Sequence, residues 1–176
     1  MALPVTLEDA KAQLRLHESV HEFDVEIDGF LHDAAAWVEQ YTGHILEQRE
    51  VTETVNGFAA PRLRAWPIAA DAAVAVSYLA AGDAVTVTGA RIDVVRRPAR
   101  LLPAVGTIWP RVAATTPVTM TFTAGYADPD DVPRNLRRAM LVLVGAYDAD
   151  REGGEILAQA EETARKLCSR YKVRSL

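Results

Sequence analysis

Cysteine is almost absent from this chain of 176 residues, which contains only Cys168. One cysteine can form neither an intrachain disulfide nor a metal site of several thiolates, and this scarcity favours a reducing compartment. Cys168 lies among cationic residues and has no histidine close to it in the sequence. We therefore expect a lone thiol at the surface and not a catalytic nucleophile.

Long hydrophobic runs are also missing. No stretch approaches the roughly 18 apolar residues that a membrane-spanning helix needs, and the amino terminus lacks the basic and apolar regions of a secretory signal. Neither GxGxxG nor GxxxxGK[ST] occurs, which argues against a nucleotide cofactor. The absences together predict a protein with no membrane partner and no cofactor.

The residues that are present suit a globular protein, with 49% hydrophobic and 24% charged side chains. This composition and length fit one domain over residues 1–176. The net charge of −5 is unevenly distributed: residues 1–43 carry 2 Lys or Arg against 9 Asp or Glu. Residues 165–176 carry five Lys or Arg and no acidic residue, so the chain ends in a basic tail.

Apolar residues at spacings of three and four predict four helices. Their expected ranges are 6–16, 24–42, 132–150 and 155–170. Thr6 and Asp9 have the spacing of a capping box at the start of the first helix.

Between the second and third helices the apolar period changes to two, as in Val51, Glu53 and Val55. Alternation of this kind predicts five or six short strands within residues 45–125, in a small antiparallel sheet or sandwich. The expected fold class is therefore α+β, with a mainly helical body and an inserted small antiparallel β domain.

The run HESVH matches the HExxH pattern of zinc enzymes through His17, Glu18 and His21. In those enzymes the two histidines lie on one face of a firm helix. Here the run follows the end of a predicted helix, and no third ligand is apparent. A solvated loop is the favoured interpretation, a metalloenzyme is the alternative, and we expect no catalytic or metal-binding residue.

Two groups are candidates for a protein interface. The first is the basic end, which could dock on an acidic protein surface, be solvated without a partner, or bind nucleic acid. The second contains two tryptophans beside apolar or proline residues, a setting typical of core or interface anchors. The candidate residues are Arg165, Lys166, Arg170, Lys172, Arg174, Trp66 and Trp109.

Several segments, in this order and spacing, resemble one family, the head-tail connector or adaptor proteins of long-tailed bacteriophages and gene transfer agents. The matching segments are LEDAKAQLRL, FLHDAAAWVEQYTG, LRAWPIAADAAVAVSYLAAGD, GTIWP and VTMTFTAGYADPDDVPRNLRRAMLVLVGAYDADREGG. They extend over most of the chain up to Gly154.

The resemblance implies a structural protein of the virion neck, assembled in the bacterial cytoplasm and without catalytic residues. It implies a ring of about twelve subunits with closed symmetry. Such a ring would dock on the portal protein, receive stopper or tail-completion proteins, and continue the channel through which DNA passes without specific binding. A protein-binding module of another phage neck component is a further alternative.

Overall fold

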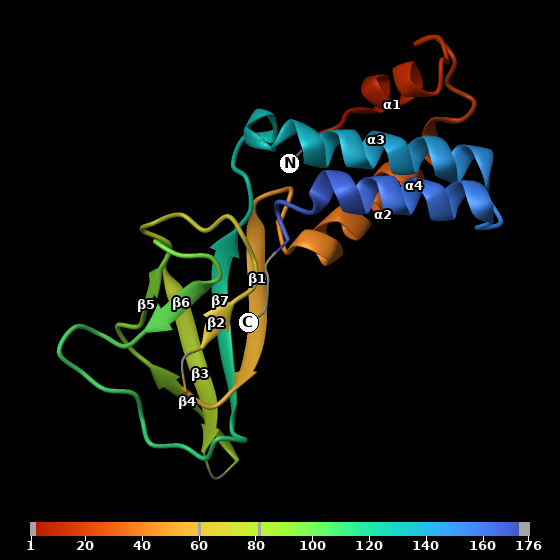
Figure 1. Ribbon diagram of the computed structural model, residues 1–176. Coiled ribbons are helices and arrows are strands. Elements are labelled where there is room, and N and C mark those ends of the chain that lie inside the picture. The colour runs from red at the N-terminus through yellow and green to blue at the C-terminus, as the bar shows by residue number, and fades with distance from the viewer. Residues whose placement is uncertain (1–2, 60, 81, 173–176) are drawn as a thin grey trace. The chain divides into compact units, whose positions relative to one another are not determined.

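The computed structural model describes residues 3–59, 61–80 and 82–172, which divide into two compact units. The helical unit combines the two ends of the chain, residues 1–47 and 126–176, and the β unit is residues 48–125 (Figure 1). A β insertion between helices was predicted, with a start at residue 45. The predicted α+β class is confirmed, but the expectation that the fold is mainly helical was wrong, because only 35% of the described residues are helical.

The first helix, α1 (Leu7–Gln13), begins with the predicted capping box. The Thr6 hydroxyl accepts from the Asp9 amide at 3.1 Å, and the Asp9 carboxylate accepts from the Thr6 amide at 3.1 Å. The helix ends before the predicted residue 16 because Arg15 adopts a left-handed conformation at φ 59°. The amide of Leu16 then donates to the carbonyl of Lys11, closing a helix-terminating turn.

The three longer helices are α2 (Asp24–Thr42), α3 (Arg134–Ala149) and α4 (Glu155–Cys168). The bounds of α2 agree with the prediction, and Gly43 ends it in a left-handed conformation at φ 74°. A 3-10 turn, η1 (Pro129–Asp131), precedes α3. Compared with the prediction, α3 is three residues shorter and α4 is two residues shorter.

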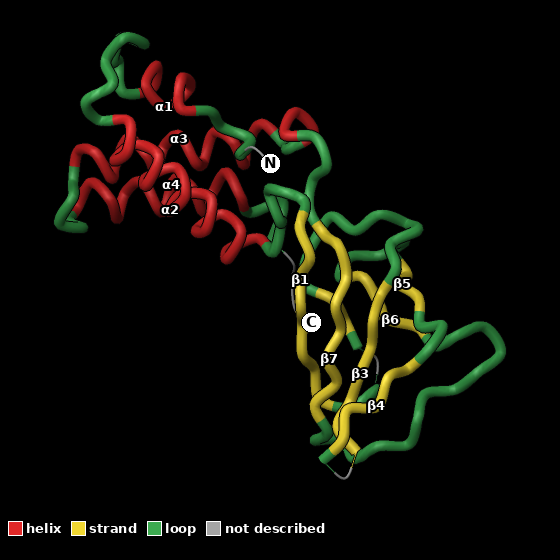
Figure 2. The backbone as a smooth tube through the Cα atoms, turned by 180° about the vertical axis from the view of Figure 1, so that it is seen from behind, coloured by secondary structure: helices red, strands yellow, loops and turns green. Residues whose placement is uncertain are grey.

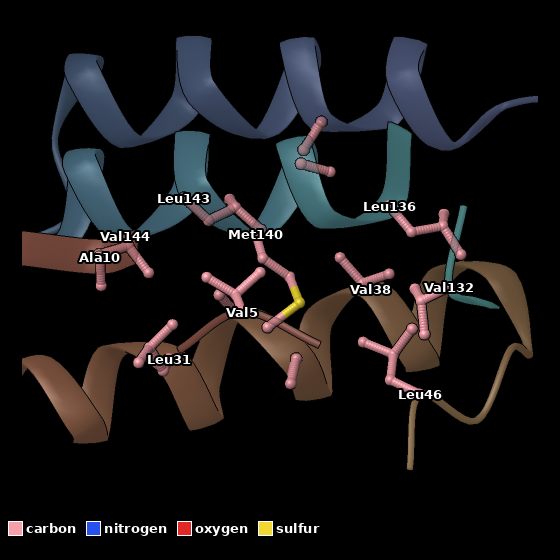
Figure 3. Close-up of a cluster of buried hydrophobic side chains, with 14 of the residues drawn as sticks. Val5, Ala10, Leu31, Val38, Leu46, Val132, Leu136, Met140, Leu143 and Val144 are labelled. Atoms are coloured by element: carbon pink, nitrogen blue, oxygen red, sulfur yellow. The ribbon is translucent and has the colours of Figure 1, made fainter. Parts of the chain in front are cut away.

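The core of the helical unit lies between α2 and α3, with α1 and α4 completing it (Figure 3). Large side chains from α2 and α3 are fully buried there, among them Leu31, Leu136, Met140 and Leu143. The face that α4 buries is made of small side chains, Ala160, Ala164 and Cys168. Small residues at intervals of four let α4 pack close to its neighbours.

Among its described residues, the β unit has seven strands in two antiparallel sheets, one more strand than the upper end of the prediction. The larger sheet has the order β1-β7-β3-β4. Its strands are β1 (Arg49–Asn56), β7 (Pro117–Ala124), β3 (Val74–Ala80) and β4 (Asp83–Val87). Along β7 the alternate residues Val118, Met120, Phe122 and Ala124 are buried, so one face of this sheet forms a core.

The smaller sheet has the order β2-β6-β5 and lies over one face of the larger one, as the front and back views show (Figures 1 and 2). Its strands are β2 (Arg62–Leu63), β6 (Ala99–Leu102) and β5 (Arg91–Asp93). Leu63, Ala99 and Leu101 are buried, so the inward face of this sheet is apolar.

Candidate interaction surfaces

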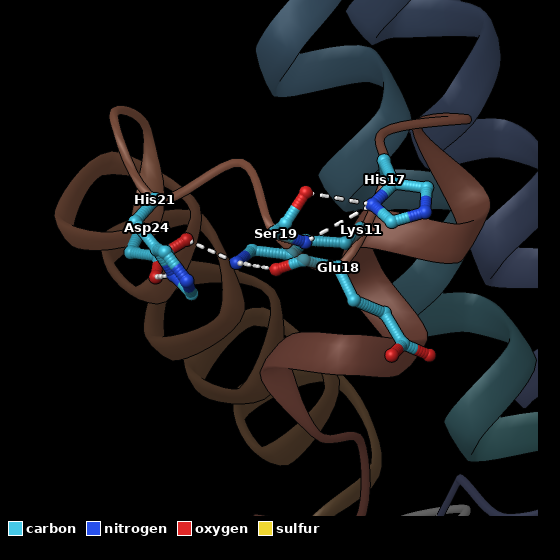
Figure 4. A network of polar contacts seen from close by, with 6 residues as sticks. All are labelled: Lys11, His17, Glu18, Ser19, His21 and Asp24. Atoms are coloured by element: carbon cyan, nitrogen blue, oxygen red, sulfur yellow. Dashed lines mark hydrogen bonds and ion pairs between the residues drawn. The ribbon is translucent and has the colours of Figure 1, made fainter.

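The HESVH run forms an irregular segment between α1 and α2 (Figure 4). Each histidine has a local partner: Nδ1 of His17 lies 2.8 Å from the Ser19 hydroxyl, and Nδ1 of His21 lies 2.9 Å from Oδ2 of Asp24. The two imidazoles lie at opposite ends of this network. Within the described ranges, no three His, Cys, Asp or Glu side chains form a group suited to a metal ion. The geometry does not favour the metalloenzyme alternative.

An ion pair that the sequence did not reveal joins α1 to α2 on either side of this segment, and its lysine is buried. Lys11 is only 3% exposed, and its amino group lies 2.5 Å from Oδ1 of Asp24. It also donates to the carbonyl oxygen of Glu18 at 3.3 Å. The hydrogen bond from Lys11, followed by that from His21, lowers the pKa of Asp24 below its ordinary value. Lys11 therefore ties α1, the loop and the start of α2 together.

The basic end is largely built into the helical unit. Arg165 pairs with Glu161 at 2.5 Å and lies 6.0 Å from the centre of the Trp37 ring. Lys172 lies 4.6 Å from the centre of the Tyr41 ring, and Trp37 and Tyr41 stack on one another at 5.3 Å. Cation–π contacts of this kind hold cations against aromatic faces. These cations contact α2 of their own chain, which the sequence did not predict.

The remaining candidates of the basic end differ in their setting. Lys166 pairs with Glu162 at 3.7 Å within α4, and Arg170 is exposed just after that helix. Arg174 lies outside the described residues. Docking of the basic end on a partner protein stays a prediction. Fewer of its cationic side chains are available to a partner than the sequence suggested, because Arg165, Lys166 and Lys172 have contacts within the chain.

The thiol of Cys168 is buried, so the expectation of a surface thiol was wrong. Burial raises its pKa to about 11. The neighbouring cations do not lower it, because Cys168 continues the inward face of α4 while Arg165 and Lys166 point outward. A thiol in this setting is protonated at neutral pH and unreactive.

The two candidate tryptophans belong to the β unit and are both half-buried. The ring of Trp109 stacks on Phe58 at 4.7 Å, and Arg97 lies 5.8 Å from the centre of the Trp66 ring. Trp109 thereby fixes the middle of an extended loop, residues 103–116, which contains no helix or strand.

That loop exposes apolar side chains. Val105 and Ile108 are each 84% exposed. Long loops without secondary structure inside a compact unit are commonly functional. The loop is anchored at its end as well, because the amide of Gly57 donates to the carbonyl of Thr116 at 2.8 Å. A Cβ at Gly57 would lie 3.3 Å from the Ala114 backbone, so the close approach favours glycine there.

The outward face of the smaller sheet is rich in arginine. Arg62 on β2 lies directly opposite Arg100 on β6, and Arg91 lies on the same side of β5. All three are exposed, and none has an ion-pair partner among the residues that the structure describes. We call Arg62, Arg91 and Arg100 the arginine face. Asp93 lies opposite Arg100, but its carboxylate accepts from the Val95 amide at 3.0 Å.

A helical unit formed by the chain ends, with a two-sheet β unit inserted, is a fold found in chains of gene transfer agent (GTA) particles. The protein is similar to a chain in the neck of an empty GTA particle computed with C6 symmetry, with a TM-score of 0.75 and 21% identity. The match covers 100% of this chain and 94% of that chain. A chain in the virion of a native GTA particle gives a TM-score of 0.72 and 22% identity, covering 100% and 94%.

A third similar chain belongs to the neck of a native GTA particle computed with C12 symmetry, with a TM-score of 0.65 and 23% identity. That match covers 94% of this chain and 89% of the other. No protein-family model and no curated protein matches the chain. The resemblance predicted from the sequence segments is therefore confirmed for the fold. Of the helices in the described ranges, none has the length and apolar character to cross a bilayer.

Proposed function

We propose that the protein is a structural subunit of a particle neck, a head-tail connector that links the capsid to the tail. The observation that carries this proposal is the similarity of fold over the whole chain to chains of GTA necks. The helical unit and the inserted β unit both take part in that similarity, because the match with the first of these chains covers 100% of this one.

In this function the chain forms a ring with copies of itself. The C6 and C12 symmetry of the similar neck structures supports a ring, with about twelve subunits as the expected number. One face of the ring binds the portal protein and the other binds stopper or tail-completion proteins. DNA passes through the ring without specific binding, and an excess of acidic side chains on the channel surface would prevent the DNA from adhering.

Two features of the chain suit docking on other neck proteins. The loop of residues 103–116 presents Val105 and Ile108 to solvent while Trp109 anchors it on Phe58. Apolar side chains on an anchored loop lose little conformational freedom when a partner covers them. The second feature is the exposed part of the basic end, in particular Arg170.

Copurification of the full chain with the portal protein and with the stopper protein tests the proposal. The wild type is expected to bind the portal, and replacement of both Val105 and Ile108 by Asp is expected to weaken binding to one partner at least tenfold. Ala113→Asp serves as the control, because Ala113 is exposed on the same loop and the added charge is of the same kind. A wild-type chain that binds neither protein would contradict the proposed function.

A further inference from the structure

The tip of the loop of residues 103–116 is a closed turn over residues 104–107. The amide of Thr107 donates to the carbonyl of Ala104 at 3.0 Å, and the Thr107 hydroxyl donates to the same oxygen at 2.8 Å. Gly106, the third residue of the turn, has a φ of 77°, whereas the φ of Val105 before it is negative. This combination defines a type II turn, in which the third position favours glycine.

Contacts on both sides hold this turn in place. Ala104 packs against the backbone at Gly89, where a Cβ would lie only 2.9 Å from the Cβ of Ala104. On the other side, Trp109 stacks on Phe58 with the ring centres 4.7 Å apart. Residues 105–108, between these two anchors, are exposed. The turn is therefore fixed at its base, while its tip is open to a partner.

The surface that the turn presents is apolar and carries no charge. Its most exposed side chains are Val105 and Ile108. Residues 101–127 contain a single charged side chain, Arg111, although charged residues make up 24% of the whole chain. A charged partner surface would therefore find almost nothing here to pair with. The buried core of a protein interface is likewise depleted of charged residues, so the tip suits an uncharged partner site.

We infer that the turn of residues 104–107 presents Val105 and Ile108 to an uncharged apolar pocket on the portal protein or on the stopper protein. This inference rests on the proposed function and adds the chemistry of the partner site and the residues that set the affinity. A tip that is already held in its bound shape loses little conformational entropy on docking. Gly106 and Thr107, which close the turn, are therefore positioning residues for the two apolar side chains.

A lipid surface and a second copy of the chain are the competing occupants. Two aliphatic side chains contain fewer carbon atoms than a myristoyl chain, which by itself gives only marginal membrane binding. Arg111 is the one basic side chain of the loop, so attraction to anionic lipids adds little. For a second copy, two pockets of the helical unit are lined by charged side chains, three arginines of α3 in one and four carboxylates in the other. Neither pocket matches an uncharged tip.

Titration calorimetry of the full chain with the portal protein and with the stopper protein tests the inference. Gly106→Ala should bind one of them about tenfold more weakly than wild type, because alanine disfavours a positive φ and fewer molecules then hold the competent turn. Gly106→Asn should stay within about threefold of wild type, since asparagine tolerates this conformation. Gly82→Ala is the matched control and should bind like wild type. Gly82 has a φ of 97° in the turn between β3 and β4, and a Cβ at Gly82 or at Gly106 would meet nothing within 4 Å.

The absence of charge in the pocket is tested by Ile108→Lys and Ile108→Glu. Each should weaken binding to the same partner by roughly tenfold or more, because an uncharged apolar pocket rejects both signs of charge. A variant of either sign that binds as tightly as wild type, or a Gly106→Ala variant that binds like Gly82→Ala, would overturn the inference. Loss of self-association, or of binding to vesicles of anionic phospholipid, in Gly106→Ala with unchanged binding to both proteins would also overturn it and assign the turn to that occupant.

The two proposals fail in different ways. If Val105→Asp with Ile108→Asp loses binding while Gly106→Ala does not, the proposed function stands and only the role of the turn is refuted. A wild-type chain that binds neither the portal protein nor the stopper protein refutes the proposed function and this inference together.

Discussion

Ala164 provides a sharp test of how the end of the chain is held, because it lies on the inward face of α4 and is 0% exposed. Replacing it with leucine adds three carbon atoms at a site where the helix packs closely on the rest of the unit. If space were available, burial of the added carbons would stabilise the fold by about 2 kcal/mol. In a filled core the same change forces neighbours apart and costs about 1–3 kcal/mol.

The structure favours the second outcome. Ala160 and Cys168, one turn before and one turn after Ala164, are buried with it, so the strip offers no room for a larger side chain. The free energy of unfolding of Ala164→Leu should therefore fall by about 1–3 kcal/mol. With a urea dependence of about 1–3 kcal/mol per molar, the midpoint should fall by about 1 M.

Urea unfolding followed by circular dichroism at the helical band measures this change. Ala158→Leu is the matched control, because Ala158 is exposed on the same helix. Alanine and leucine both form helices well, so the control should change stability by no more than about 0.5 kcal/mol. Equal stability of the two variants, or a more stable Ala164→Leu, would refute the packing of α4 against the unit through its small side chains.

Three further predictions concern single side chains. Lys11 is the main cause of the lowered pKa of Asp24. The pair therefore stabilises the fold at any pH above 3.8, the ordinary pKa of Asp24. This stabilisation is lost as the pH falls through the lowered pKa that Asp24 has in the folded protein. Lys11→Met should therefore be less stable than wild type at pH 7 in urea unfolding, and the difference should shrink in acid; a difference that is constant with pH would contradict this. The thiol of Cys168, with its pKa raised to about 11, should react with a disulfide reagent at pH 8 only when urea unfolds the helical unit, and prompt labelling of the native protein would show that it is not buried. Trp109→Ala should destabilise the β unit by about 0.5–1.5 kcal/mol through loss of the stack on Phe58. Thermal unfolding measures this change, and an unchanged midpoint would mean that the ring does not anchor the loop.

The sequence predicted those elements in which local chemistry decides the structure. The bounds of α2 followed from its apolar spacing and from Gly43, and the capping box of Thr6 and Asp9 is present. The end of α1 was missed because Arg15 takes a left-handed conformation, which residues other than glycine adopt infrequently. Strands β2 and β6 of the smaller sheet were missed because they contain only two and four residues, too few for a clear alternation.

The candidate surfaces were harder to predict because they depend on contacts between distant residues. No pattern in the sequence near Lys11 predicts its ion pair with Asp24. The arginine face depends on the register that sets Arg62 opposite Arg100, and a list of separate arginines does not contain that register. Cys168 is different, since Ala160 and Ala164 at intervals of four already mark the buried face that includes it.

Electron microscopy of the purified chain bound to its portal protein tests whether the chain is a ring-forming neck subunit. We expect a closed ring of this chain seated on the portal, with rotational symmetry and an open central channel. Supplying the stopper protein should extend the complex on the side away from the portal. A chain that stays monomeric in the presence of the portal, or that binds it only as isolated subunits without forming a ring, would contradict the assignment as a neck subunit.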